Sequence, residues 1–175
     1  MYSLESVVQQ LKKHRNRKIV LVGGCYDIFH VGHLRILSKA KKLGDVLIVG
    51  INSDRLIKTT KSKYRPIIPE QQRAEVLMGL KAVDYVFITN RALYDDKNIC
   101  KIKPDYLVFG TEKRKLKRRK KTAAGIEKRF PDTETIFLSS GSYRNSTTKI
   151  EARILKRNLP RLASRSRTIR TAVLP

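Results

Sequence analysis

The chain has 175 residues, of which 41% are hydrophobic and 31% are charged. That length can bury one substantial core, and this composition excludes a chain that stays disordered throughout. No apolar run reaches the roughly 20 residues of a membrane-spanning helix, and the N-terminal segment lacks the apolar core and cleavage site of a secretion signal. We therefore expect a cytoplasmic protein without a membrane span.

The charge is strongly positive, with 39 Lys and Arg against 15 Asp and Glu and a formal net charge of +24. Such a charge attracts nucleic acid, anionic membranes and triphosphates alike, so it does not identify a partner. Much of the excess lies in residues 112–121, which read EKRKLKRRKK, and in residues 151–175. The two cysteines, Cys25 and Cys100, have no C-x-x-C spacing and predict neither a disulfide nor a zinc site.

Short apolar runs alternate with amphipathic segments along the chain. After a first helix at 3–13, strands are predicted at 18–23, 45–51, 85–88, 106–109 and 135–138. Helices are predicted at 33–43, 69–81 and 95–101 and from about residue 147, and the basic run 113–121 is interpreted as a solvated loop. This order predicts an α/β fold, with a doubly wound, mostly parallel sheet, helices on both of its faces, and ligands at the carboxyl ends of the strands.

The domain is predicted to cover residues 1–157. Residues 158–175 show no periodic apolar face and contain scattered Arg, Ser and Pro, so we expect a basic, flexible tail there.

The segment 23–33, GGCYDIFHVGH, is the most informative part of the chain. Gly24 would allow backbone to approach a phosphate closely, Gly32 would allow an unusual dihedral angle, and the following helix offers unpaired N–H groups to an anion. His30 and His33 could then stabilise the negative charge that builds up when a phosphate oxygen attacks an α-phosphate. Taken alone, two histidines are equally consistent with satisfied polar residues in a turn or with metal ligands.

The segment GCYDIFHVGH resembles the motif of the cytidylyltransferase-type nucleotidyltransferases, which have a Rossmann-like fold and an HxGH motif. The resemblance continues in family order through LGDVLIVGINSD, RPIIPEQQRAEVLMGLKAVDYV, IKPDYLVFG and STTKI. Within the family the chain looks most like heptose 1-phosphate adenylyltransferases and next most like glycerol-3-phosphate cytidylyltransferase. The resemblance implies an enzyme that joins a nucleotidyl group from ATP or CTP to a phosphorylated sugar or polyol and releases pyrophosphate.

The resemblance also implies roles for individual residues. His30, His33 and Lys63 are the implied catalytic residues, although Lys58 and Lys61 compete with Lys63 for its position. The implied nucleotide-binding residues are Gly24, Cys25, Tyr26, Asp27, Gly32, Asn52, Asp54, Arg73, Gly110, Ser146, Thr147 and Thr148. Mg²⁺ would accompany the triphosphate, no residues are assigned as dedicated metal ligands, and a homodimer is expected.

Plainer interpretations accompany two of these assignments. Ser146 and its neighbours could form an ordinary helix N-cap, and Arg73 could be a solvated helical charge. The chain also departs from the heptose type where Phe109-Gly110-Thr111-Glu112 replaces a Lys-Gly-Gly-Asp-like stretch, which leaves the choice of nucleobase open.

Two alternatives to the favoured activity remain. One is another enzyme of the family, such as a glycerol-3-phosphate-type cytidylyltransferase or an FAD synthase-like enzyme. The other is a nucleic-acid-binding protein on a retired transferase fold, motivated by the basic segments. The intact His-Val-Gly-His argues against retirement.

Overall fold

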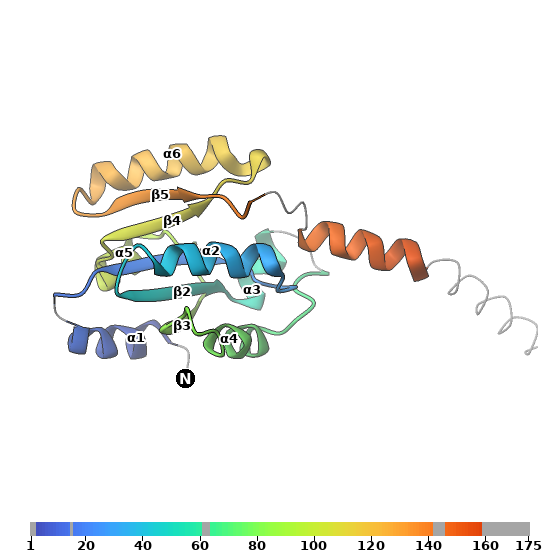
Figure 1. The fold of residues 1–175 in the computed structure, drawn as a ribbon, viewed down its shortest axis with the longest axis horizontal. Coiled ribbons are helices and arrows are strands. Elements are labelled where there is room, and N and C mark those ends of the chain that lie inside the picture. The colour runs from blue at the N-terminus through green and yellow to red at the C-terminus, as the bar shows by residue number, and fades with distance from the viewer. Residues whose placement is uncertain (1–2, 15, 61–63, 142–145, 159–175) are drawn as a thin grey trace, which may run out of the picture. The chain divides into compact units, whose positions relative to one another are not determined.

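The computed structural model describes residues 3–14, 16–60, 64–141 and 146–158. The chain divides into two compact units, residues 1–142 and 143–175. Strands and helices alternate in the first unit (Figure 1). Its elements are α1 (Leu4–Leu11), a 3-10 helix (Lys12–His14), β1 (Ile19–Gly24), α2 (Val31–Lys41), β2 (Val46–Asn52), α3 (Asp54–Thr60), α4 (Glu70–Met78), β3 (Tyr85–Thr89), α5 (Asp96–Ile102), β4 (Tyr106–Gly110), α6 (Lys113–Arg129) and β5 (Glu134–Leu138). In the second unit, residues 147–158 form a helix.

The five strands form one parallel sheet in the order β3-β2-β1-β4-β5. The chain begins in the middle of the sheet at β1, runs outward to β3, and returns through α5 to β4 on the other side of β1. The strand order therefore reverses between β1 and β4. In doubly wound sheets this reversal separates the loops that follow the two strands and leaves a crevice for a ligand at their carboxyl ends. The predicted fold is confirmed.

Helices cover both faces of the sheet. α2 and α4 pack on one face through buried residues such as Leu37 and Leu77. α1, α5 and α6 pack on the other face, where Val7, Ile99 and Ile126 are buried. A sheet covered on both sides needs apolar residues at successive positions of its strands, and the first six residues of β2 are all buried.

Two glycines leave room for one side chain above the middle of the sheet. Gly23 and Gly50 are paired in the register of β1 and β2. A Cβ atom on Gly23 would lie 1.6 Å from Leu93 Cδ2, and one on Gly50 would lie 1.9 Å from Leu93 Cδ1. Leu93 lies between β3 and α5 and is buried. It therefore fixes the connection that carries the chain from the edge of the sheet back to β4.

The structure corrects one part of the sequence prediction. The basic run 113–121 is not a solvated loop, because it forms the first half of the 17-residue helix α6. Lys and Arg favour helix, and the anchoring residues Ala123 and Ile126 come only after the charged run. The short helix α3 was not predicted either. The proposed tail, residues 158–175, lies outside the described residues except for Asn158. Among the helices that the structure describes, none is long and apolar enough to cross a membrane.

Candidate functional site

His30 caps the helix that follows β1. It is the N-cap residue of α2, and its Nδ1 accepts a hydrogen bond from the Gly32 N–H at 3.0 Å. Because Nδ1 is the acceptor, the neutral imidazole carries its proton on Nε2. The Nε2–H is therefore a donor at the N-terminus of α2, where the helix dipole also favours an anion.

His33 lies beside His30 in the first turn of the same helix. The two imidazole rings are stacked with centroids 3.9 Å apart and an interplanar angle of 24°. His33 also contacts the ring of Tyr26 at 5.1 Å and that of Phe29 at 5.6 Å. Because aromatic neighbours hold these rings, both imidazoles are fixed before any ligand binds, which is the condition for preorganised charge stabilisation.

Gly32 serves packing and does not adopt the unusual dihedral angle that we expected. It lies within α2, and the only glycine with a positive φ among the described residues is Gly141. A Cβ atom at Gly32 would lie 2.8 Å from His30 Cε1 and 2.9 Å from its Nδ1. The glycine between the two histidines is therefore required because the His30 ring folds back over it.

Glu112 is a carboxylate that acts on the charge of His30. Burial lowers the pKa of His30 below its ordinary value, and the Glu112 carboxylate opposes this effect without overcoming it. Glu112 follows β4 and accepts from Lys115 at 2.8 Å and from Arg119 at 3.0 Å. Burial would raise the pKa of Glu112, but the two cations hold it below its ordinary value. At neutral pH the site therefore contains a neutral His30 and an ionised Glu112.

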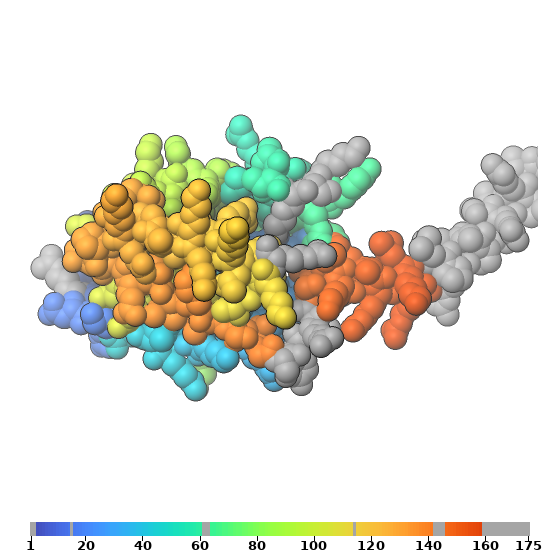
Figure 2. All heavy atoms as spheres, turned by 90° about the horizontal axis from the view of Figure 1, so that it is seen from above, coloured from blue at the N-terminus to red at the C-terminus, as the bar shows by residue number. Residues whose placement is uncertain are grey.

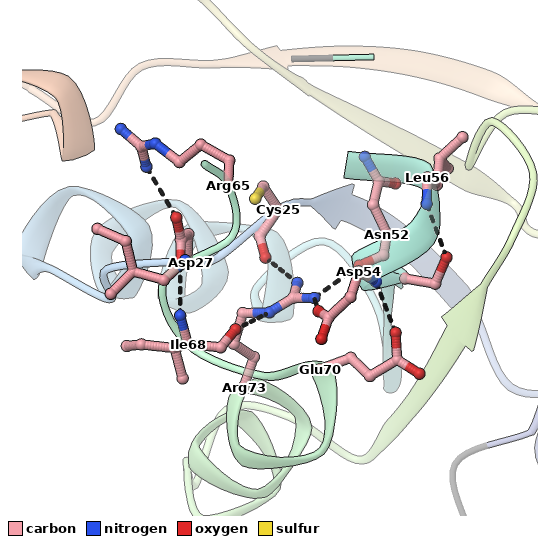
Figure 3. Close-up of polar contacts among 11 residues, drawn as sticks. Cys25, Asp27, Asn52, Asp54, Leu56, Arg65, Ile68, Glu70 and Arg73 are labelled. Atoms are coloured by element: carbon pink, nitrogen blue, oxygen red, sulfur yellow. Dashed lines mark hydrogen bonds and ion pairs between the residues drawn. The ribbon is translucent and has the colours of Figure 1, made fainter. Parts of the chain in front are cut away.

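Arg73 joins four segments at the carboxyl edge of the sheet (Figure 3). Its side chain is fully buried. Nε donates to the Ile68 carbonyl at 2.9 Å, and Nη1 donates to the Cys25 carbonyl. Nη2 donates to the Asn52 carbonyl at 3.0 Å and to the Asp54 carboxylate at 2.6 Å. Since all three nitrogens donate to protein atoms, Arg73 positions the loop after β1 against the end of β2 and the start of α3.

Asp27 fixes the segment that precedes α4 (Figure 3). This buried carboxylate accepts from Arg65 Nη1 at 2.8 Å and from the backbone N–H groups of Ile67 and Ile68 at 2.8 and 2.9 Å. Burial alone would raise the pKa of Asp27, but these donors outweigh it and hold the pKa below its ordinary value. Asp27 therefore connects the turn that carries the histidines to the segment before α4.

Gly24 and Gly110 adjoin the same turn. A Cβ atom on Gly24 would lie 3.1 Å from the ring of Tyr26. The carbonyl of Gly110 accepts from Arg119, and a Cβ atom there would lie 3.6 Å from Ile36 Cδ1 of α2. The structure thus brings together predicted residues at or just after the ends of β1, β2 and β4, three neighbouring strands of the sheet.

The described contacts do not test the other predicted residues at this edge. Lys61 and Lys63 lie outside the described residues, and Lys58 is exposed on α3. Ser146, Thr147 and Thr148 belong to the second unit. There the Ser146 Oγ accepts from the Lys149 N–H at 3.3 Å, so Ser146 is the N-cap of the helix 147–158. Contact of these residues with phosphate stays a prediction.

Sequence reasoning missed several residues that shape the site. Glu70 accepts from the Asp54 N–H at 2.6 Å, and Arg65 pairs with Asp27. Glu112 could have been found, because it follows a predicted strand as Asp54 does. Arg119 could not, because nothing distinguishes it from its neighbours in a run of cations. In the part of the chain that the structure describes, no three His, Cys, Asp or Glu side chains are grouped as they would be around a metal ion.

Comparison with known proteins adds relatives of this chain. The family model described as Cytidylyltransferase-like matches residues 21–153. The bifunctional protein HldE of Campylobacter concisus is 43% identical over 114 residues, which cover 63% of this chain and 23% of that protein. The protein of the same name from Syntrophotalea carbinolica is 36% identical over 157 residues, which cover 86% of this chain and 29% of its own length. The chain thus spans less than a third of these relatives.

Solved structures share the fold. A lipopolysaccharide core biosynthesis protein from Thermoplasma volcanium is 25% identical with a TM-score of 0.57, over 73% of this chain and 99% of the other. Pantothenate synthetase from Thermus thermophilus is 13% identical with a TM-score of 0.56, over 79% of this chain and 60% of that protein. At this identity the second likeness concerns the fold alone.

Proposed function

We propose, because the chain belongs to the cytidylyltransferase-like family of nucleotidyltransferases, that it transfers the adenylyl group of ATP to a heptose 1-phosphate. In this reaction an oxygen of the sugar phosphate attacks the α-phosphorus and forms a new P–O bond. The bond from that phosphorus to the oxygen that bridges it to the β-phosphate breaks, and pyrophosphate leaves with the electron pair. The products are an ADP-sugar and pyrophosphate.

One observation supports the proposal most strongly: the stacked pair His30 and His33 at the start of α2, beside the reversal of strand order. Negative charge grows on the non-bridging oxygens of the α-phosphate during the transfer. Fixed donors aimed at those oxygens stabilise the transition state more than the bound substrate. The Nε2–H of His30 and the ring of His33 are the donors that we assign to this role, and they need not accept or release a proton.

Further assignments rest on the family resemblance. Mg²⁺ would bind together with the triphosphate and neutralise part of its negative charge. This ion usually binds proteins through substrate phosphates and only one or two carboxylates. One of Lys58, Lys61 and Lys63 would contact the phosphates, as would the turn that contains Ser146. Asn52, Asp54 and Arg73 would shape the nucleotide-binding edge through the contacts described above.

We also infer a cytoplasmic homodimer. Exposed apolar side chains on α4 and the segment before it support self-association. They are Tyr64, Ile67, Val76 and Met78. The test is the native mass of the full chain by sedimentation at two protein concentrations. A strictly monomeric chain at tens of micromolar would contradict the homodimer without affecting the proposed reaction.

Pyrophosphate release tests the reaction itself. ATP and CTP are each combined with Mg²⁺ and with heptose 1-phosphate, glycerol 3-phosphate or flavin mononucleotide. We expect release only with ATP and heptose 1-phosphate. Release with CTP and glycerol 3-phosphate, or with ATP and flavin mononucleotide, would replace the proposed substrates with those of another enzyme of the family. No release from any pair by a folded protein would contradict all three.

A further inference from the structure

The exposed side of α6 carries a line of lysines. With 100° between successive helical residues, Lys117, Lys121 and Lys128 fall on the side opposite the buried Ala123 and Ile126, and Lys113 and Lys120 flank that side. We call this set the α6 ridge, and it consists of Lys113, Lys117, Lys120, Lys121 and Lys128. All five side chains are exposed, and Figure 2 looks onto α6, which runs in yellow and orange across this face.

No carboxylate of the described residues pairs with a lysine of the ridge. Among the described residues, none of its five ammonium groups takes part in an ion pair, whereas Lys115, Arg119 and Arg129 each pair with a carboxylate. The single acidic residue of α6 is Glu127. Its carboxylate accepts from the N–H and the hydroxyl of Thr135 on β5. The five ammonium groups of the ridge are therefore exposed and make no ion pair with any residue that the structure describes.

The shape of the charge distribution indicates a polymeric ligand. The ridge extends over 16 residues of a straight helix, which is about 22 Å at 1.5 Å per residue. A nucleotide or sugar phosphate would reach only one or two of these ammonium groups. A nucleic-acid duplex carries one negative charge per roughly 1.7 Å of its axis, so it can meet all five at once.

We propose that the α6 ridge binds the phosphate backbone of a nucleic-acid duplex without reading its sequence. The five lysines of the ridge hold phosphate as point charges and lack the planar fork of a guanidinium group. Affinity should therefore be set by the number of phosphates contacted and by salt, and should be the same for unrelated sequences.

The composition of α6 separates this ligand from two other polyanions. A helix that inserts into a membrane surface needs an apolar side directed outward, but the apolar residues Ala123 and Ile126 are buried in the core. None of the large exposed apolar side chains of the described chain belongs to α6. Single-stranded nucleic acid is usually held by aromatic rings that stack on its bases, and α6 contains no aromatic residue.

The ridge is also separable from the site. Lys115 and Arg119, which hold Glu112, lie on the other side of α6 and are not part of the ridge. Substitutions on the ridge should therefore weaken duplex binding and leave pyrophosphate release unchanged. Conversely, His30→Asn should leave duplex binding unchanged.

The test compares two triple variants of the full chain. Lys117→Gln, Lys120→Gln and Lys121→Gln remove three charges from the ridge. Lys12→Gln, Lys13→Gln and Lys81→Gln remove three exposed charges elsewhere and give the same net charge. Binding to two fluorescent 20-base-pair duplexes of unrelated sequence is measured by anisotropy between 50 and 300 mM salt.

We expect the ridge variant to bind both duplexes about tenfold or more weakly at 100 mM salt. Its salt slope should fall by about 3, because each phosphate contact contributes about 1. The control variant should keep most of the affinity. Equal losses in the two variants would mean that net charge alone drives binding and would overturn the proposal. Displacement of the duplex by phosphatidylglycerol vesicles at equal total charge, with the same dependence on the ridge, would overturn it in favour of a lipid surface.

Discussion

At the scale of residues, the site depends on how His30 is oriented and charged. Its Nδ1 is occupied by the Gly32 N–H, and burial favours the neutral ring. The donor that we assign to the α-phosphate is therefore Nε2–H, and this role needs no protonation. A lowered pKa keeps the ring in that form throughout the neutral range.

NMR titration of the three histidines tests this state. We expect the pKa of His30 to lie below the ordinary value for histidine, because burial disfavours the imidazolium. Glu112→Gln removes a carboxylate that raises this pKa, so it should lower the pKa of His30 further. A pKa of His30 at or above the ordinary value would contradict the neutral state that we assign to the ring at neutral pH.

Arg73 is the residue whose loss should most disturb the framework of the site. Arg73→Met leaves the Asp54 carboxylate and three carbonyls without their donor, and removing one partner of a buried ion pair typically costs about 3–5 kcal/mol. We expect a loss of unfolding free energy at the lower end of that range, because Asp54 is partly exposed. Urea unfolding is the measurement.

Arg129→Met is the matched control for Arg73→Met. Both members of the Arg129–Asp96 pair are about half exposed, so the change should cost no more than about 1 kcal/mol. Equal losses for the two variants would mean that Arg73 does not connect the segments around the turn as described.

Sequence reasoning identified the turn with His30 and His33 because glycines and histidines are rare in such a combination. It also selected Arg73 and Asp27, but as residues that contact nucleotide. Many of their partners are backbone groups, of residues such as Cys25, Asn52 and Ile68. Every residue type has these backbone groups, so the sequence does not indicate which of them are bonded. The positioning role could therefore be seen only in the structure.

At the scale of elements, packing across the sheet depends on the absence of two Cβ atoms. Gly50→Ala would place a methyl group 1.9 Å from Leu93 Cδ1 and displace the side chain that anchors the β3–α5 connection. Overpacking of this kind costs about 1–3 kcal/mol. We expect a lower midpoint of thermal or urea unfolding for Gly50→Ala.

Gly125→Ala serves as the comparison, because it should raise the stability that Gly50→Ala lowers. This glycine lies inside α6, and its nearest neighbour would be the flexible end of Arg129 at 3.4 Å. Alanine favours helix over glycine by about 0.5–1 kcal/mol, so this variant should be more stable. Stabilisation by both substitutions would show that Leu93 does not pack against β2 as described.

The elements themselves were largely predictable, because buried parallel strands read as short apolar runs and most helices had a periodic apolar side. α6 was the exception. Its first turns are almost wholly cationic, and the periodic signal depends on a few residues such as Leu116, Ala123 and Ile126. A long charged run such as residues 113–121 is more typical of a loop, and the apolar repeat that follows it is weak. The helix is therefore apparent only from its packing against the sheet.

At the scale of the whole molecule, stability should decrease in acid. The pKa values of Asp27 and Asp105 lie below their ordinary values, because burial is outweighed by backbone N–H groups and by Arg65 or Lys18. A carboxyl group with a lowered pKa in the folded state stabilises the protein above its ordinary pKa. That contribution is lost as the pH falls through the folded-state pKa.

Unfolding free energy measured by urea between pH 7 and pH 3 should therefore fall with pH. Asp27→Asn should lower stability at pH 7 and make the fall less steep, since one of the responsible groups is gone. A profile whose steepness is unchanged in Asp27→Asn would show that the buried Asp27 is not ionised in the folded state.

Family and fold were predictable at this scale as well, because the motifs follow one another in family order over most of the chain. The family model that matches residues 21–153 confirms this assignment. The acceptor and the nucleobase could not be derived from the chain, since they depend on side chains around a bound ligand. The proposed binding surface on α6 could not be located either. The sequence does not show which side of a basic helix faces solvent until the packing of that helix is known.

The turnover of variants at the histidine pair tests the central claim most directly. His30→Asn and His33→Asn are compared with wild type in pyrophosphate release from ATP and heptose 1-phosphate. Asparagine at residue 30 can still cap α2, so a change there reports the loss of the imidazole. His14→Asn is the control, because His14 bonds the Tyr85 hydroxyl at 2.8 Å near the amino end of β3.

We expect kcat to fall about 100- to 1000-fold in each site variant, as for the removal of one fixed donor to a transition-state oxygen. The His14→Asn variant should keep the wild-type kcat. Wild-type turnover in His30→Asn and His33→Asn would contradict the assignment of the catalytic site to the first turn of α2.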